Sequence, residues 1–299
     1  MNIGAKIRQL RTERGISQEQ MAEQLSVSRQ AVTKWETGAG APDIENLAAV
    51  ARLFGVSTDE LLSEGPARDS GDAQPSFESV TVLDLSNPVD FDIQAGCARS
   101  ILISGTESEK VSVVLRSDTI VDLERAFKVV LDTQGRSFDI DVENTGVVAD
   151  VIAGKELDVV IELPAAYAES AEIELNAGAC TIQNTSMDFE LSGHLRHLRL
   201  QQVDGHLQID TSGNLEATAT GVTGKLDINQ IGATSILHLD EKISFAASTR
   251  GRLGRRTLRF THDGNPVPQP EESSEAPALL VELAGSRVEL TIDTVSTAG

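Results

Sequence analysis

The spacing of apolar side chains changes once along this chain, and that change most constrains its fold. Before residue 63, apolar residues recur three or four positions apart, as on one face of an α-helix. From Phe77 onward they alternate with polar residues, as in 138–142, which is the period of a half-buried β-strand. A chain of 299 residues is long enough for two domains. The sequence therefore predicts a small all-α domain over residues 1–64 and an all-β domain over residues 77–299.

Capping residues divide the first domain into short helices. Ser17 is followed three positions later by Gln20, which is the capping-box pattern at the start of a helix. Ser28 is placed to cap the next helix, which runs over 29–36. Similar start and stop residues predict three more helices, over the first ten or so residues, from Pro42, and over 58–62. The first domain is therefore expected to contain five helices.

A polar segment, residues 65–76, separates the two domains. It has almost no apolar content and contains two prolines, Pro66 and Pro75. A flexible chain of this length has a root-mean-square reach of roughly 20 Å. We expect this linker to tether the domains without fixing their orientation.

The second domain contains a repeat. Each unit reads as a short strand, a corner of small or polar residues, and a second strand. The units are expected to open 16 to 19 residues apart, at Ile173, Phe189, Leu207, Leu226 and Ile243. Such regular strand-corner units predict a β-solenoid, with a β-sandwich as the competing architecture.

Two further segments of this domain have a definite expectation. Residues 128–142 read as a hairpin around 133–136, although residues 123–131 are also compatible with a brief helix. A proline-rich acidic loop over 266–277 precedes closing strands over 279–295.

Charge limits where this protein can meet nucleic acid. The net charge is −21, but residues 1–35 hold six basic and three acidic side chains. Residues 67–299 carry 18 basic and 37 acidic side chains, a net of −19, and would be repelled by DNA. Any DNA contact must therefore come from the first domain.

The sequence indicates a cytoplasmic protein without a membrane anchor. It has no apolar run long enough to span a bilayer and no secretory signal pattern at its beginning. Cys97 and Cys180 are too few to form a disulfide framework, and small buried fillers are expected at both positions, with a redox pair as the alternative.

The helices at 18–25 and 29–36 carry the clearest functional pattern. Two short helices joined by a four-residue turn fit helix-turn-helix geometry, in which the second helix enters the major groove of DNA. That groove is about 12 Å wide, and its donor and acceptor pattern distinguishes all four base pairs. The second helix offers polar side chains on one flank and a small apolar flank for packing.

Several sequence segments in the right order make this resemblance specific. Residues 1–66 resemble the Cro and phage-repressor type of helix-turn-helix domain, the XRE family, whose fold is lambda-repressor-like. The matching segments are Ile7-Arg8-Gln9-Leu10-Arg11, Ser17-Gln18-Glu19-Gln20-Met21-Ala22, Ser28-Arg29-Gln30-Ala31-Val32-Thr33-Lys34-Trp35-Glu36-Thr37-Gly38, Pro42-Asp43 and Phe54-Gly55-Val56-Ser57-Thr58-Asp59-Glu60-Leu61-Leu62.

The resemblance assigns roles to residues of this chain. It implies base contacts by Arg29, Gln30, Thr33 and Lys34. It implies DNA-backbone contacts by Gln18, Ser28 and Thr37, and a structural salt bridge between Arg11 and Glu36. Plainer alternatives remain: a solvated Arg11–Glu36 pair, a Ser28 that only caps its helix, and a Thr33 that only fills the groove. The loop after Gly38 departs from the family, because Ala39-Gly40-Ala41 offers no cation to phosphate.

The second domain resembles the adhesin-like β-solenoid domain of unknown function, and it shows no catalytic motif. No enzyme activity, cofactor or metal is therefore expected. His194 and His197 are three positions apart on a strand, which directs the two rings to opposite faces rather than to one metal. Five arginines gather in a short segment: Arg250, Arg252, Arg255, Arg256 and Arg259. They are read as a solvated turn, or alternatively as an interface with an acidic partner copy or with phosphate.

These observations predict a sequence-specific, DNA-binding transcriptional regulator, of repressor type. Its expected partners are a double-stranded DNA operator and a second copy of the chain, with the β domain assembling the protein or sensing an unknown ligand or protein. The alternative makes the β domain a scaffold or binding module, joined to an autoregulatory, antitoxin-like DNA-binding domain.

Overall fold

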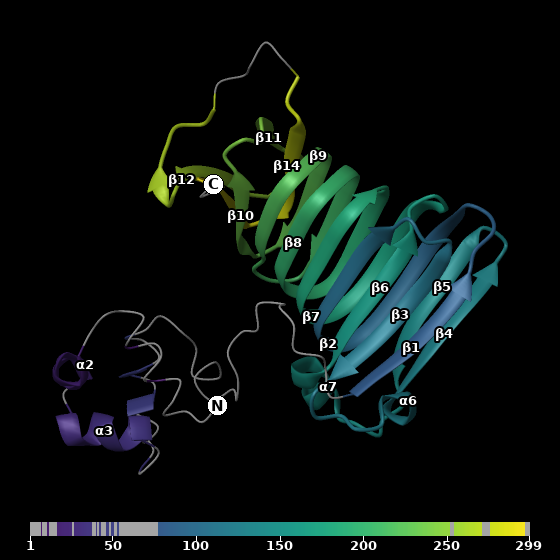
Figure 1. Ribbon diagram of the computed structural model, residues 1–299. Helices are drawn as coiled ribbons and strands as arrows, with labels where there is room; N and C mark the ends of the chain where they lie inside the picture. The colour runs from purple at the N-terminus through teal and green to yellow at the C-terminus, as the bar shows by residue number, and fades with distance from the viewer. Residues whose placement is uncertain are drawn as a thin grey trace. The chain divides into compact units, whose positions relative to one another are not determined.

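In the computed structural model of the protein, the chain divides into two compact units, Met1–Gln74 and Pro75–Gly299. The structure describes residues 7, 11, 17–25, 27–37, 40, 42, 46, 47, 49, 50, 53, 77–251, 254–270 and 276–296 (Figure 1). The predicted fifth helix and the linker expected at 65–76 lie outside these residues, and the first and fourth helices are described only at single helical positions.

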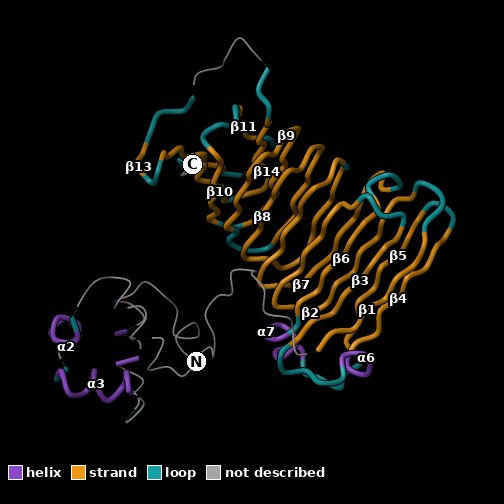
Figure 2. Tube along the Cα trace, viewed as in Figure 1, coloured by secondary structure: helices purple, strands orange, loops and turns teal. Residues whose placement is uncertain are grey.

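Two helices of the first unit are described, and both start where the sequence predicts. They are α2 (Gln18–Leu25) and α3 (Arg29–Thr37) (Figure 2). At the start of α2, the Gln20 amide donates to Ser17 Oγ at 3.1 Å, and the Ser17 amide donates to Gln20 Oε1 at 2.7 Å. This reciprocal pair is the predicted capping box. At the start of α3, the Ala31 amide donates to Ser28 Oγ at 3.1 Å, so Ser28 is a helix cap.

The core of the first unit is formed where the helices meet. Met21, Val32 and Val50 are fully buried, and Trp35 is 6% exposed. Because α2 and α3 pack through these side chains, the opposite flank of α3 faces away from the core.

The second unit is all-β, with two short helices. Its strands join into one fifteen-stranded sheet in the described residues. The strands are β1 (Phe77–Asp84), β2 (Val89–Thr106), β3 (Lys110–Ser117), β4 (Phe127–Gln134), β5 (Ser137–Asn144), β6 (Asp158–Pro164), β7 (Ala168–Ser186), β8 (Asp188–Thr211), β9 (Glu216–Ile231), β10 (Thr234–Asp240), β11 (Phe245–Thr249), β12 (Arg256–His262), β13 (Asn265–Pro266), β14 (Leu279–Ser286) and β15 (Val288–Val295). The helices are α6 (Leu123–Ala126) and α7 (Asp150–Glu156).

The predicted hairpin and the brief helix both exist, one after the other. Residues 123–126 form α6, and β4 follows directly and pairs antiparallel with β5. Gln134 pairs with Ser137, and Gly135 supplies the positive φ of 68° that the tight turn between them requires.

The middle of the sheet is a parallel stack. β7, β8 and β9 pair in parallel, with partner residues 18 or 19 positions apart in the sequence. Apolar residues therefore lie on apolar residues: Ile173 pairs with Leu191, and Leu207 with Leu226. The expected 16-residue step from Ile173 to Phe189 is wrong, because Phe189 pairs with Ala171. The small Ala171 gave no hydrophobic signal at that position.

Glycine permits the closest approach between neighbouring turns of this stack. A Cβ on Gly193 would lie 2.1 Å from the backbone oxygen of Leu175, and the φ of Gly193 is +111°. Any other residue would therefore push two paired strands apart at this corner.

The end of the chain lies inside the stack rather than at its edge. β14 pairs with both β9 and β11, while β15 pairs with both β10 and β12. On the side away from Leu207, Leu226 consequently pairs with Val281, and the fifth repeat expected to open at Ile243 does not stack on the fourth. The alternation of apolar and polar residues did not reveal this strand order, because β11 and β14 carry the same two-residue period.

At the other end of the sheet, antiparallel pairing begins beyond β5 and β6, which are themselves parallel neighbours of β2. On β2, residues 90–95 pair with β5 and residues 100–106 pair with β6. β4 extends the first of these pairings, and β3 followed by β1 extends the second. β1 and β4 therefore end two branches of the sheet at the same end of the unit (Figure 1).

Candidate nucleic-acid interface

The helix α3 has one buried flank and one polar, exposed flank. Val32 and Trp35 are buried in the core. Arg29, Gln30 and Lys34 are exposed. These three side chains fall on one flank of the helix, because positions one, four and five apart lie within about half a turn of each other.

An ion pair joins α3 to the segment before α2. Arg11 Nε lies 2.6 Å from Glu36 Oε1, and Arg11 Nη2 donates to Glu36 Oε2 at 3.2 Å. The Glu36 side chain is 2% exposed and that of Arg11 is 13% exposed, so this is not a solvated pair. The hydrogen bond to Glu36 raises the pKa of Arg11, although burial acts in the opposite direction.

Gln18 completes this polar centre. Its Nε2 donates to Glu36 Oε2 at 2.7 Å, and its Oε1 accepts from Thr33 Oγ1 at 3.2 Å. The first residue of α2 is thus bound to two residues on successive turns of α3. Sequence reasoning missed this bridge, because it depends on how the two helices are placed in space.

The other predicted contact residues have mixed surroundings. Thr33 is half-buried, and its hydroxyl also donates to the Arg29 carbonyl at 3.0 Å. Ser28 is exposed while its hydroxyl caps α3. Thr37 is the last residue of α3, and its side chain lies outside the described residues.

The acidic side chain of Glu19 lies near the exposed flank of α3. Glu19 Oε2 is 4.0 Å from Arg29 Nη1, with exposed fractions of 79% and 65%. A pair this long and this exposed is worth less than about 1 kcal/mol. Arg29 is therefore only loosely held by Glu19.

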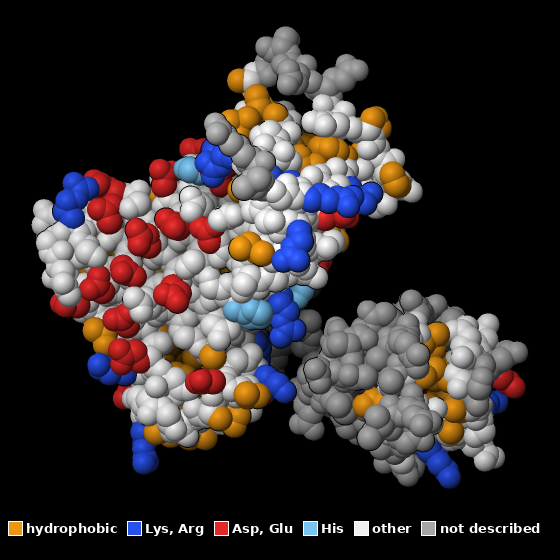
Figure 3. All heavy atoms as spheres, turned by 180° about the vertical axis from the view of Figure 1, so that it is seen from behind, with side chains coloured by type: hydrophobic (Ala, Val, Ile, Leu, Met, Phe, Trp, Pro, Cys, Tyr) orange, Lys and Arg blue, Asp and Glu red, His pale blue; other side chains and the backbone are white. Residues whose placement is uncertain are grey.

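The β unit presents a surface that opposes nucleic acid. Acidic side chains gather on one face of it (Figure 3). They lie opposite each other on neighbouring strands, as in Asp139, Asp92, Glu172 and Glu190 in order across the sheet. Burial, followed by the nearby Glu143, Asp139 and Asp92, raises the pKa of Asp141. A face this acidic disfavours contact with phosphate.

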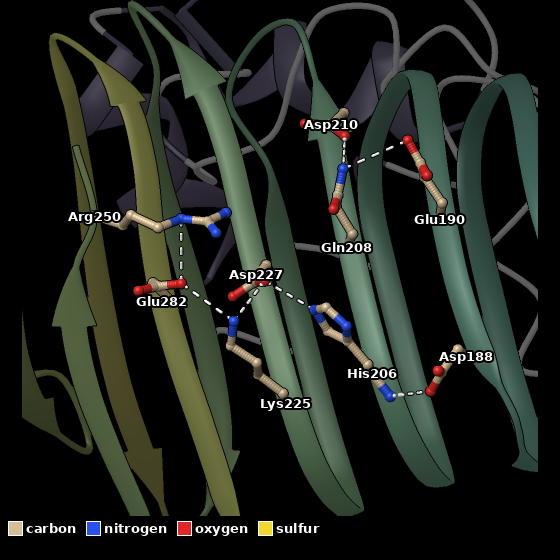
Figure 4. A network of polar contacts seen from close by, with 9 residues as sticks. All are labelled: Asp188, Glu190, His206, Gln208, Asp210, Lys225, Asp227, Arg250 and Glu282. Atoms are coloured by element: carbon tan, nitrogen blue, oxygen red, sulfur yellow. Dashed lines mark hydrogen bonds and ion pairs between the residues drawn. The ribbon is translucent and has the colours of Figure 1, made fainter.

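Farther along the same stack, the charges are balanced by cations. Lys225 Nζ lies 2.8 Å from Asp227 Oδ2 and 3.2 Å from Glu282 Oε2, and His206 Nε2 lies 2.8 Å from the same Asp227 oxygen (Figure 4). Burial alone would raise the pKa of Asp227, but the hydrogen bonds from Lys225 and His206 outweigh it and lower that pKa. The network crosses three neighbouring strand segments and ties them together.

The arginine cluster is largely engaged within the β unit. Arg250 Nε lies 3.3 Å from Glu282 Oε2, and Arg259 Nε lies 2.6 Å from Glu289 Oε1. Arg256 donates to the carbonyls of Gly251 and Gly254. Arg252 lies outside the described residues, and Arg255 is exposed.

A small open cleft lies beside the corner that contains Cys97. Its volume is about 220 Å³, and its lining includes Cys97, Asp150, Asn176, His194 and Arg196. Asn176 Nδ2 lies 3.3 Å from Cys97 Sγ. Both cysteines are free; Cys180 is buried, and burial raises its pKa to about 12.

Among the described residues, neither a metal-binding cluster nor a membrane-spanning helix is found. Among them, no three His, Cys, Asp or Glu side chains are grouped to hold a metal ion. His194 and His197 are both exposed, with the buried Leu195 between them, and His197 Nδ1 faces Glu216 at 3.4 Å. No helix in the described part of the chain is long and apolar enough to cross a membrane.

Comparison with known proteins identifies the first unit. Residues 7–61 match the helix-turn-helix family. The chain is 51% identical over 63 residues to the HTH-type transcriptional activator BcrR of Enterococcus faecalis, a match that covers 21% of this chain and 31% of BcrR. The chain thus spans about a third of that relative's length.

Two solved structures are also similar to parts of the chain. The P22 c2 repressor, in complex with a synthetic operator, is 32% identical over 21% of this chain and 94% of its own, with a TM-score of 0.20. A "putative cell adhesion protein" from Clostridium sporogenes aligns with 74% of this chain and all of its own, at 11% identity and a TM-score of 0.36. The amino-terminal part of this chain is therefore a helix-turn-helix domain of the XRE type, homologous to those of transcriptional regulators.

Proposed function

We propose that this protein is a sequence-specific DNA-binding transcriptional regulator. Its α3 enters the major groove, where Arg29, Gln30, Thr33 and Lys34 contact base edges. The observation that carries this is the arrangement of α3: its apolar flank is buried, while Arg29, Gln30 and Lys34 remain exposed on the other side. A groove about 12 Å wide accommodates one helix presented in this way.

Contacts to the DNA backbone position α3 in the groove. We assign these to Gln18, Ser28 and Thr37, at the amino end of α2 and at the two ends of α3. The Gln18 side chain is held by Glu36 and Thr33, so the contact at Gln18 uses the backbone N–H groups at the start of α2. The Gln18 side chain orients α3 through its bonds to Glu36 and Thr33.

Two copies of the chain are needed for tight binding. A single helix-turn-helix makes few base contacts, and such domains bind half-sites about 34 Å apart, or a multiple of that distance. We propose that the protein binds as a homodimer and represses transcription by occupying its operator.

The β unit, joined to the first unit by the linker at 65–76, then serves assembly or sensing. We infer that it is a β-solenoid. The support is the parallel pairing of β7, β8 and β9 with a constant offset of 18 or 19 residues, which a sandwich of antiparallel strands does not produce. Its acidic face keeps DNA contacts within the first unit.

The test begins with selecting an operator from random duplexes with the full-length protein. Footprinting of the selected duplex should then show two protected patches on one side of the helix, about one turn or a whole number of turns apart. Failure to enrich any sequence, at salt concentrations where binding is measurable, would contradict a sequence-specific regulator.

A second candidate makes the β unit the active part, with the first unit as an antitoxin-like, autoregulatory module. The observation behind it is the open cleft of about 220 Å³ beside Cys97, which Asn176, His194 and Arg196 help to line. Removal of residues 67–299 tests what the β unit contributes. If operator affinity survives and regulation is lost, the β unit is a sensor; if affinity collapses, it assembles the dimer.

A further inference from the structure

β1 is an open sheet edge with exposed apolar side chains. Among the described strands it pairs with β3 alone. Val80 is 54% exposed, Val82 47% and Leu83 39%. An edge strand of eight residues leaves a row of backbone donors and acceptors open to another strand.

Three other edge strands among the described residues, β4, β11 and β13, are less suited to such pairing. The exposed side chains of β4 are Lys128, Asp132, Thr133 and Gln134. Lys128 also pairs with Glu143 of β5. Charged side chains and short length both discourage edge pairing, and the edge strands β11 and β13 have only five and two residues. β1 differs from these strands in that three of its exposed side chains, Val80, Val82 and Leu83, are large and apolar.

Local charge makes the surface around β1 suitable for a second copy. Arg116 Nε lies 2.9 Å from Glu78 Oε2, and Lys110 Nζ lies 3.3 Å from Asp84 Oδ1. The acidic side chains of β1 are thus neutralised by the basic ones of β3. Residues 67–299 carry a net charge of −19, so two copies repel each other elsewhere more than they do here.

An apolar row leads across the sheet to this edge. Val80 pairs with Val114, Val114 with Val160, and Val160 with Leu102. Residues paired across a sheet point to the same face, so these four side chains form one row that ends at the exposed Val80.

We infer that β1 pairs antiparallel with β1 of a second copy, with Val80 opposite Val80 of the partner subunit. This register joins the two apolar rows. It also sets Phe77 opposite Leu83 of the partner subunit and uses seven residues of the strand. A shift that centred the pairing on Thr81 would set Glu78 opposite Asp84 of the partner subunit, bringing acidic side chains together. The interface is isologous, as in a two-fold dimer.

This pairing also suits the proposed function. The comparison of linker reach with half-site spacing rests on that function. In this register the two Phe77 residues start roughly 20 Å apart, since six residues of antiparallel strand separate them. Residues 65–76 precede Phe77, and their expected reach is roughly 20 Å on each side. Two half-sites about 34 Å apart are within that range.

Light scattering on the full-length protein without DNA tests whether β1 forms the dimer interface. Wild type should be a dimer at micromolar concentration, and Val80→Lys should be a monomer. The matched control is Val121→Lys, since Val121 is 70% exposed but lies outside β1; it should remain dimeric. A monomeric wild type, or a dimeric Val80→Lys protein, would overturn the inference.

Disulfide trapping tests the register in protein that is folded. Val80→Cys is made in a Cys97→Ala background, because Cys97 is half-buried while Cys180 is buried. Mild oxidation should cross-link two Val80→Cys chains at least tenfold faster than two Val121→Cys chains. Equal rates would overturn the proposed pairing.

The two proposals fail separately. Self-association is measured without DNA, so its failure leaves the assignment of α3 intact. Conversely, operator binding that does not change when α3 is substituted would refute the proposed regulator function. The measured β1 pairing would still stand.

Discussion

Gln18, the first residue of α2, donates its side-chain amide to the carboxylate of Glu36 near the end of α3, at 2.7 Å. Glu36 also receives two hydrogen bonds from Arg11 and is almost fully buried. One carboxylate therefore fixes the position of the proposed recognition helix relative to two other segments of the first unit.

Replacing Glu36 should destabilise the first unit. Glu36→Ala leaves the Arg11 charge without its partner and the Gln18 amide without its acceptor, at a cost of about 3 kcal/mol. Trp35 is the one tryptophan of the chain and is buried in the first unit, so its fluorescence reports unfolding there. Glu19→Ala is the control, because Glu19 is 79% exposed, and it should change stability by less than about 0.5 kcal/mol. Equal effects would contradict the role given to Glu36.

Gln18→Ala should weaken binding to all DNA sequences by a similar factor. The substitution removes the bridge that positions α3 and disturbs the amino end of α2, but it removes no base contact. Gln24→Ala changes the same residue type at an exposed position of α2 and should have little effect. Competition between operator and unrelated duplexes measures this, and a loss confined to the operator would contradict the assignment.

Local features of this fold could be predicted from the sequence, and non-local ones could not. The capping box of Ser17 and Gln20 needs only residues three positions apart. The insertion of β14 between β9 and β11 depends on pairings more than thirty residues apart, and every candidate strand has the same alternation.

The same distinction applies to the site. Resemblance identified Arg11 and Glu36 as a pair, yet the Gln18 bridge between them and Thr33 follows from helix packing. The equivalence of Ala171 and Phe189 was also hidden, since a small side chain at a repeat position gives no hydrophobic signal.

The network around Asp227 should make the β unit sensitive to acid. Hydrogen bonds from Lys225 and His206 hold the pKa of Asp227 below its usual value. A carboxylate with a lowered pKa in the folded state contributes stability above its unfolded pKa of about 3.9, and that contribution is lost as pH falls through the folded value. Asp227→Asn should therefore lower the free energy of unfolding at pH 7 by about 1–3 kcal/mol, with a smaller difference below pH 3.

Urea unfolding followed by circular dichroism in the β-sheet region measures this difference at both pH values. Glu174→Gln, which changes an exposed carboxylate on β7, is the control and should have little effect at either pH. A difference for Asp227→Asn that grows as pH falls would contradict the sign argued here.

The two cysteines should differ in reactivity. Burial raises the pKa of Cys180 to about 12, and its side chain is inaccessible, so alkylation at pH 8 should leave it unmodified in folded protein. Cys97 is half-buried and its pKa is raised by burial and by Asp150, so it should react slowly. Mass spectrometry of digested protein, with urea-unfolded protein as the reference, distinguishes the two sites. Modification of Cys180 at the unfolded rate would contradict its placement in the core.

The most direct test of the central claim compares wild type with Arg29→Ala on every single-base variant of the selected operator. If α3 reads bases in the major groove, the variant should lose preference at one base pair in each half-site, by about 1–3 kcal/mol, and keep its preferences elsewhere. An unchanged binding profile across all variants would show that this flank of α3 does not read the operator.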